Sequence, residues 1–225
     1  MTFRLVVVAL AVGIALGLKR HYADARAEDL VWILGPTSRL AGAMSGVRFV
    51  FQPGEGYFSR EHLFLIAKAC AGVNFMVAAF GMVTVTLLHR ARSLATAAGV
   101  LGTSLLASYG AAVVVNAVRI VAALWLATHP VSMLSAGDVH RLEGIVVYFG
   151  GLVLLYGLVR RLDRPATSVG LALPLTAYYV VTLVIPILGG ASSSSGFAGH
   201  AIVVLGVPVL LILTAFGVQT MARRS

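Results

Sequence analysis

Long runs of apolar residues, separated by short connections, constrain this chain more than any other feature. Of its 225 residues, 59% are hydrophobic and 11% are charged, whereas soluble domains carry about 25% charged residues. A soluble core of this size could not bury so much apolar surface. The sequence therefore predicts an all-α, polytopic integral membrane protein, organised as a single domain over residues 1–225.

Six of these runs approach or exceed the length that crosses a bilayer, which is roughly 20 apolar residues in a helix. They are Phe3–Leu18, His62–Leu88, Leu94–Thr128, His140–Val159, Val169–Leu188 and Phe197–Val218. The first run is short, but the residues before Lys19 do not form a signal-peptide cleavage site. We therefore interpret it as a span.

The basic residues of the short connections predict which side of the membrane each connection faces. Arginines occur after residues 88 and 159 and in the C-terminal tail, whereas segments 130–139 and 189–196 contain no Lys or Arg. Cytoplasmic connections carry the excess of Lys and Arg. Both termini are therefore expected in the cytoplasm, and the uncharged connections are expected outside.

The formal net charge of +9 would suggest nucleic-acid binding in a soluble protein. Here the basic clusters flank apolar runs, where they orient the chain in the membrane. Nucleic acid is therefore excluded as a partner, and membrane lipid is expected instead. One cysteine in the chain cannot form an internal disulfide.

Residues 19–61 are expected to form an outward-facing interfacial loop, although they contain several basic residues. Acidic residues partly offset this charge, and longer loops obey the positive-inside rule less strictly. Within the loop, Leu30–Phe51 is apolar but interrupted by Pro36, Arg39 and Arg48. We interpret it as helix in or on the outer interface. The alternative is a seventh span, which would place the N-terminus outside.

Three reactive side chains interrupt the apolar runs, and ionisable groups inside a membrane indicate a functional site by default. With the orientation above, Cys70 lies about eight residues, or roughly 12 Å, inside the outer end of its helix. Arg119 lies in the outer half of its run, and His140 opens its helix at the outer boundary. The three residues are therefore expected to meet in one leaflet.

Polar neighbours support this expected site. Asn74 follows Cys70 by four residues and Asn116 precedes Arg119 by three, spacings that place each pair on one helix face. Glu143, three residues after His140, could orient the imidazole. The run that carries Arg119, Leu94–Thr128, is longer than a bilayer requires, so it is expected to tilt, to break near Gly110 or to project outward.

These residue types are sufficient for acyl transfer through a thioester. A thiolate is the nucleophilic form of cysteine, and a guanidinium, which stays charged, stabilises the thiolate or the oxyanion that follows its attack on a carbonyl. Histidine can protonate the leaving amine and deprotonate the incoming nucleophile. No Gly-x-Ser-x-Gly elbow, phosphate loop or paired metal ligands occur, and no cofactor is expected.

Each residue also has a structural interpretation. A cysteine is often a small buried hydrophobe, and an arginine in a membrane helix can hold helices together. His129 and His200 are interpreted as structural. Two other functional classes therefore remain open: another membrane enzyme, such as an acyltransferase or a hydrolysing peptidase, and a non-catalytic subunit or small transporter.

Three short motifs nevertheless resemble one family. The string Ala69–Phe75, Ala-Cys-Ala-Gly-Val-Asn-Phe, resembles the C-x-G motif around the active cysteine of exosortases and archaeosortases. Asn116–Ile120 is similar to their N-x-x-R-I motif, and His140 with Gly144 to their H-x-x-x-G motif. The likeness covers roughly the central half of the chain, with a catalytic region at about 56–159. The short chain and the string from Lys68 to Phe75 look most like the exosortase K subgroup.

The resemblance implies a cysteine transpeptidase or peptidase with sortase-like chemistry on an unrelated, all-α fold. It implies catalytic roles for Cys70, Arg119 and His140. Its partners would be surface-protein precursors whose C-terminal sorting signal combines a recognition motif, a transmembrane helix and a basic cluster. The implied location is the bacterial inner membrane, with the active site toward the periplasmic face.

Overall fold

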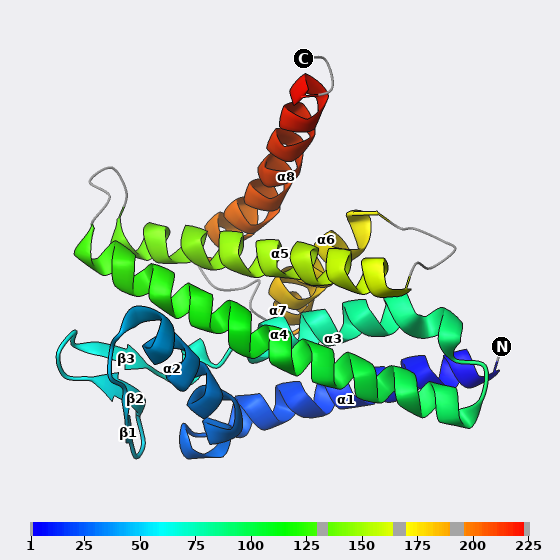
Figure 1. The fold of residues 1–225 in the computed structure, drawn as a ribbon, viewed down its shortest axis with the longest axis horizontal. Coiled ribbons are helices and arrows are strands. Elements are labelled where there is room, and N and C mark those ends of the chain that lie inside the picture. The colour runs from blue at the N-terminus through cyan, green and yellow to red at the C-terminus, as the bar shows by residue number, and fades with distance from the viewer. Residues whose placement is uncertain (1, 130–134, 164–169, 190–195, 223–225) are drawn as a thin grey trace.

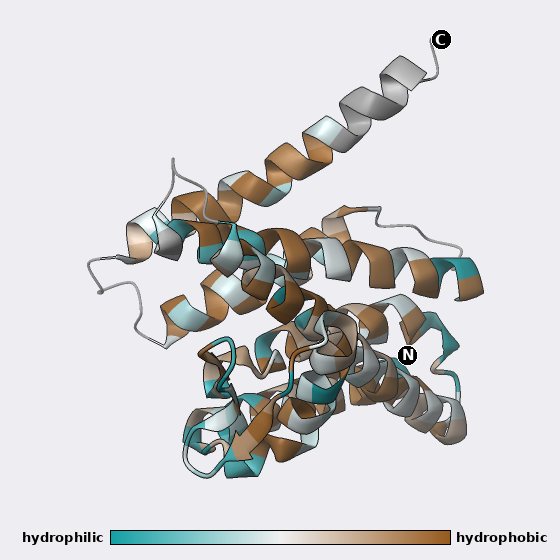
Figure 2. Ribbon diagram, turned by 60° about the vertical axis from the view of Figure 1, so that its left-hand side comes forward, coloured by the Kyte–Doolittle hydropathy of each residue, from teal (hydrophilic) through white to brown (hydrophobic). Residues whose placement is uncertain are grey.

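The computed structural model describes residues 2–129, 135–163, 170–189 and 196–222. Five helical stretches among these residues are long and apolar enough to cross a membrane. The prediction of an all-α polytopic membrane protein is therefore confirmed. Hydrophobic residues extend along the long helices, and hydrophilic residues gather at the connections and around a small sheet (Figure 2).

The elements follow one another along the chain as labelled in Figure 1. They are α1 (Thr2–Asp24), the 3-10 turn η1 (Glu28–Leu30), α2 (Val31–Ser45), β1 (Val50–Gln52), β2 (Gly56–Ser59), β3 (Phe64–Ile66), the 3-10 turn η2 (Lys68–Cys70), α3 (Val73–Leu87), the 3-10 turn η3 (Leu88–Arg90), α4 (Leu94–Thr128), α5 (Ala136–Asp163), α6 (Ala172–Tyr179), the π-helical turn η4 (Val180–Val184), α7 (Ile185–Leu188) and α8 (Phe197–Ala222). Helices α1, α3, α4 and α5 pack along one another, and α8 extends away from them (Figure 1).

Polar contacts gather three basic segments at one end of this bundle, which we call the basic end. Arg4, at the start of α1, donates to the carbonyl of His89 at 3.4 Å. Asp163, at the end of α5, pairs with both His89 and Arg90. The N-terminus, the α3–α4 connection and the end of α5 therefore share one end. The sheet, α2, the last turns of α4 and the first turns of α5 lie at the opposite end, the site end (Figure 1).

Helix α4 is continuous over 35 residues. It begins at a capping box in which the Ser93 hydroxyl accepts from the backbone of Thr96 and the Thr96 hydroxyl accepts from the backbone of Ser93, which satisfies otherwise orphaned donors. At 1.5 Å per residue its length is about 52 Å, well beyond the roughly 30 Å of a bilayer core. A break near Gly110 does not occur, so tilt or projection must accommodate the excess.

The predicted helix His62–Leu88 is wrong over its first eleven residues. Strand β3 pairs antiparallel with β2 in the register Phe58↔Leu65, and α3 begins only at Val73. Aromatic and branched apolar residues favour strand as readily as membrane helix in a short run. Cys70 consequently lies in η2, before the helix, and not eight residues inside it.

Residues 19–61 also contain more structure than a loop. Helix α1 continues to Asp24, and α2 packs on α4, where the Tyr109 hydroxyl donates to the carbonyl of Trp32 at 2.8 Å and the two rings stack. At 15 residues, α2 reaches about 22 Å and is not among the candidate spans. The antiparallel sheet β1-β2-β3 was not predicted at all.

The predicted span Val169–Leu188 begins outside the described residues and is shorter than expected. The apolar helical stretch runs over Ala172–Leu188 and contains the wide turn η4 just before Pro186. A proline lacks the amide hydrogen and clashes with the carbonyl four residues earlier, and a π-helical turn is one way to absorb this defect. The basic residues Arg164, Arg223 and Arg224, used above for orientation, also lie outside the described residues.

Candidate active site

Two neighbouring helices present the predicted polar residues to each other at the site end. Asn116 and Arg119 are one turn apart on α4, and His140 and Glu143 are one turn apart on α5. The sequence spacing placed each pair on one helix face, and the packing of α4 against α5 brings the two faces together. Cys70 approaches from a third direction, in the turn that precedes α3.

The cysteine turn is held in place by Asn116. The side-chain amide of Asn116, which is fully buried, donates to the backbone carbonyl of Cys70. Gly72 lies between η2 and α3 with a φ of +70°, in the left-handed region. A Cβ at Gly72 would lie 3.2 Å from Cγ of Asn116. The glycine of the C-x-G motif therefore serves both the turn and the close approach of the asparagine.

Tyr148 connects Asn116 to Arg119. Its hydroxyl donates to Oδ1 of Asn116 at 2.9 Å and accepts from Nη1 of Arg119 at 3.2 Å. The guanidinium also lies over the tyrosine ring, 5.1 Å from its centroid. Sequence reasoning missed Tyr148, although it lies eight residues after His140 on α5, a spacing that returns close to the same helix face.

Arg119 contacts two further residues of the predicted site, His140 and Glu143. Its Nη2 lies 2.8 Å from Nε2 of His140, and its Nε lies 3.5 Å from a carboxylate oxygen of Glu143. Because arginine can only donate, Nε2 of His140 accepts, which leaves the imidazole neutral with its hydrogen on Nδ1. That nitrogen lies 3.7 Å from the same Glu143 oxygen. Glu143 thus pairs with the arginine and faces the imidazole, as its spacing predicted.

The glycine of the H-x-x-x-G motif makes room for the arginine. A Cβ at Gly144 would lie 3.4 Å from Nε of Arg119, at the lower limit of ordinary van der Waals contact. The guanidinium therefore packs against bare backbone of α5 between Glu143 and Tyr148. The spacing of this motif has a direct steric reason in the structure.

Asn74 does not take the position expected from its spacing to Cys70. The two residues do not share a helix face, because Cys70 precedes α3. Instead, Oδ1 of Asn74 accepts from Nζ of Lys19 on α1 at 2.7 Å. Lys68 is also tied to α1, since it donates to the carbonyl of Ala23 at 2.9 Å.

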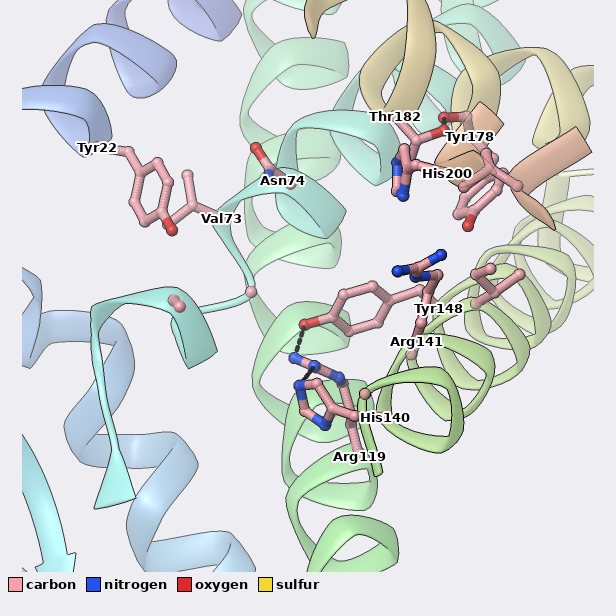
Figure 3. A pocket seen from close by; sticks show the side chains of 16 residues that line it. Tyr22, Val73, Asn74, Arg119, His140, Arg141, Tyr148, Tyr178, Thr182 and His200 are labelled. Atoms are coloured by element: carbon pink, nitrogen blue, oxygen red, sulfur yellow. Dashed lines mark hydrogen bonds between the residues drawn. The ribbon is translucent and has the colours of Figure 1, made fainter. Parts of the chain in front are cut away.

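A cavity of about 400 Å³ opens beside this network. Arg119, His140 and Tyr148 lie on one side of it, and Tyr178, Thr182 and His200 lie on the other, with Arg141 between them (Figure 3). His200, interpreted from the sequence as structural, thus lines the cavity. Tyr178 lies on α6, Thr182 in η4 and His200 on α8. Hydropathy identifies each of these segments separately and cannot predict that they face the same cavity.

Cys70 is half-buried and does not itself line the cavity. Ala69 and Gly72, on either side of it in the chain, are among the lining residues. Cys70 contacts the network through its backbone carbonyl, which Asn116 binds. Arg119 is the central residue of the network, because it contacts Tyr148, His140 and Glu143. Within the described residues, no group of three His, Cys, Asp or Glu side chains could hold a metal ion.

Comparison with known proteins adds no family assignment. No family model, no curated protein and no solved structure matches the chain.

Proposed function

We propose that the protein is a membrane-embedded cysteine peptidase or transpeptidase of the exosortase type. One observation carries the proposal: Asn116, Tyr148 and Arg119 form a continuous hydrogen-bonded path from the backbone of Cys70 to His140. Three motifs that are distant in sequence thus contribute to one network beside a cavity. The path ends at the backbone carbonyl of Cys70 and thereby fixes the turn that carries the thiol next to the network.

In the proposed first half-reaction, the proton of the Cys70 thiol passes to Nε2 of His140, and the thiolate attacks the carbonyl carbon of the scissile peptide bond. A protonated Nε2 can no longer accept from Arg119. Nη2 of Arg119 is then free to donate to the oxyanion on the former carbonyl oxygen. Proton transfer and oxyanion stabilisation are coupled in this way through one hydrogen bond.

When the C–N bond breaks, its electron pair stays on the nitrogen, which takes the proton from His140. The C-terminal part of the precursor leaves as an amine, and the remainder stays on Cys70 as a thioester. An acceptor amine or water, deprotonated by His140, then attacks the thioester and releases the Cys70 thiolate. The His140 side chain, 58% exposed, has the freedom to face both Arg119 and substrate.

The proposed substrates are surface-protein precursors with a C-terminal motif, a transmembrane helix and a basic cluster. We place the protein in a bacterial inner membrane with the basic end in the cytoplasm, because the short connections, to which the positive-inside rule applies most strictly, carry their arginines at that end. The site end, with Cys70 and the cavity, then faces the periplasm. This orientation exposes the cysteine to precursors that have crossed the membrane.

Co-expression with a tagged candidate precursor from the same genome tests the proposal. The cleaved form should appear with the wild-type chain and be absent with Cys70→Ala, while Cys70→Ser should be severely impaired because a hydroxyl is far less acidic than a thiol. Leu106→Ala, at a 74% exposed position of α4, controls for expression and insertion. Normal cleavage by well-expressed Cys70→Ala protein would reject the cysteine mechanism.

A further inference from the structure

Helix α3 is the most enclosed long helix of the bundle, yet one stripe of it remains uncovered. Twelve of its 15 residues are buried. The three others are Asn74, Gly81 and Val85, which recur at intervals of seven and four and therefore share one helix face. The stripe covers about 16 Å along the helix, from the site end toward the basic end.

This stripe is the floor of an apolar groove. Helices α1 and α6 form the walls of a cavity of about 390 Å³ along Ala78, Gly81 and Val85. Its lining is apolar except for Lys19 and Thr176. Apart from Gly81 itself, its two chain neighbours and the nearby backbone of α3, no atom of the described residues lies within 4 Å of the position where a Cβ of Gly81 would stand. The middle of the groove is therefore open down to the backbone of α3.

The groove meets the active-site cavity at one hydrogen bond. Lys19 lines the groove, Asn74 lines the cavity, and Nζ of Lys19 donates to Oδ1 of Asn74 at 2.7 Å. A ligand that passes this pair moves from a polar cavity beside Arg119 and His140 to a purely apolar surface between membrane helices. Such a ligand is polar at the site and apolar for about 16 Å beyond it.

We infer that this groove binds an apolar transmembrane helix, namely the one that follows the cleavage site of the substrate. The inference rests on the proposed function, because that function supplies a substrate with such a helix. The small residues favour a helix over a lipid chain. Glycine and alanine at helix interfaces let two backbones approach closely, and Gly81, with Ala78 one turn before it, offers such a surface at the centre of the groove.

Docking in the groove would hold the substrate helix along α3 and present the residues before it to the cavity next to Cys70. The occupied groove would also cover the face of α3 that the described residues leave open. Binding energy from the helix, which is remote from the reacting bond, would then orient that bond at the cysteine.

Site-specific photocross-linking in lipid vesicles tests this inference without any cleavage. The full-length protein carries p-benzoylphenylalanine in place of Val85 in the groove, or in place of Leu106 on α4 as a matched control, at positions that are 49% and 74% exposed. The probe is a biotinylated single-span peptide of about 20 alternating Leu and Ala residues, the length that spans a bilayer. Random collision in the membrane should label both positions alike.

We expect at least about fivefold more peptide adduct at position 85 than at position 106. Gly81→Leu fills the groove and should abolish the difference, whereas Gly102→Leu, at another open glycine outside the groove, should preserve it. Should Gly81→Leu protein fail to accumulate, the comparison of positions 85 and 106 alone decides. Equal amounts of peptide adduct at positions 85 and 106 would overturn the inference. Position 85 cross-linking to phospholipid alone would also overturn it, because the groove would then be a lipid site.

The experiments distinguish failure of the proposed groove from failure of the proposed peptidase function. Equal peptide labelling together with Cys70-dependent cleavage would reject the groove and leave the peptidase in place. Preferential labelling at position 85 without Cys70-dependent cleavage would keep a helix-binding groove and reject the peptidase.

Discussion

Nη2 of Arg119 lies 2.8 Å from Nε2 of His140, so these two residues, which the proposed acyl transfer would use together, form one hydrogen-bonded unit across α4 and α5. The same guanidinium contacts Tyr148 through Nη1 and Glu143 through Nε. Each of its three nitrogens thus has a different partner. This fork explains why an arginine, and not merely a positive charge, occupies position 119.

Arg119→Lys should therefore inactivate the protein almost as fully as Arg119→Ala. Lysine offers a point charge in place of the planar fork, so it cannot contact His140, Tyr148 and Glu143 together. Loss of an oxyanion donor costs about 10²–10³-fold in rate. The measurement is precursor cleavage, normalised to protein level in the membrane. Retention of most activity by Arg119→Lys would reduce the role of Arg119 to a general positive charge.

Tyr148→Phe removes the hydroxyl that joins Asn116 to Arg119 but keeps the ring. Leaving Oδ1 of Asn116 without its donor should destabilise the protein by about 1–3 kcal/mol, and the misplaced guanidinium should slow cleavage by up to about 10²-fold. Thermal unfolding in detergent and cleavage assays measure the two effects.

The matched control for Tyr148→Phe is Tyr109→Phe, which removes a hydrogen bond to the carbonyl of Trp32 on α2. This variant should lose stability to a similar degree and keep its activity. If both variants lose activity in proportion to stability, Tyr148 has only a structural role.

Gly144→Ala should impair cleavage through Arg119. The added methyl group would stand 3.4 Å from Nε of the guanidinium, at the lower limit of ordinary contact, and would remove the free space on that side of its fork. Alanine also favours the helical state over glycine by about 0.5–1 kcal/mol, so α5 itself should not be weakened. Gly150→Ala, on the same helix with nothing within 4 Å, is the control and should cleave normally. Equal activity of the two variants would contradict the steric role of Gly144.

The orientation of the chain can be tested with its one cysteine. A membrane-impermeant thiol reagent should label Cys70 in intact spheroplasts, slowly because the thiol is half-buried. In a Cys70→Ala background, Arg92→Cys, in the exposed connection at the basic end, should be labelled only after the membrane is opened. The reverse pattern would invert the proposed orientation.

Much of this molecule could be predicted from residues close in sequence. Apolar composition and run length determine which segments must be membrane helices, because lipid leaves the backbone few alternatives to helix. Spacings of three and four residues determine which side chains share a helix face. Asn116 with Arg119 and His140 with Glu143 were therefore predicted as pairs, and the structure places both pairs in one network.

Tertiary structure alone decided how those pairs meet. Short apolar runs such as residues 62–72 are compatible with helix and with strand. Pairing with β2 decides between the two, so the position of Cys70 in η2 could not be predicted from the neighbouring sequence. The bridging position of Tyr148, the pairing of Asn74 with Lys19 and the approach of His200 depend on how each helix rotates and packs against its neighbours. Hydropathy carries no information about that rotation, and it is the rotation that assembles the site.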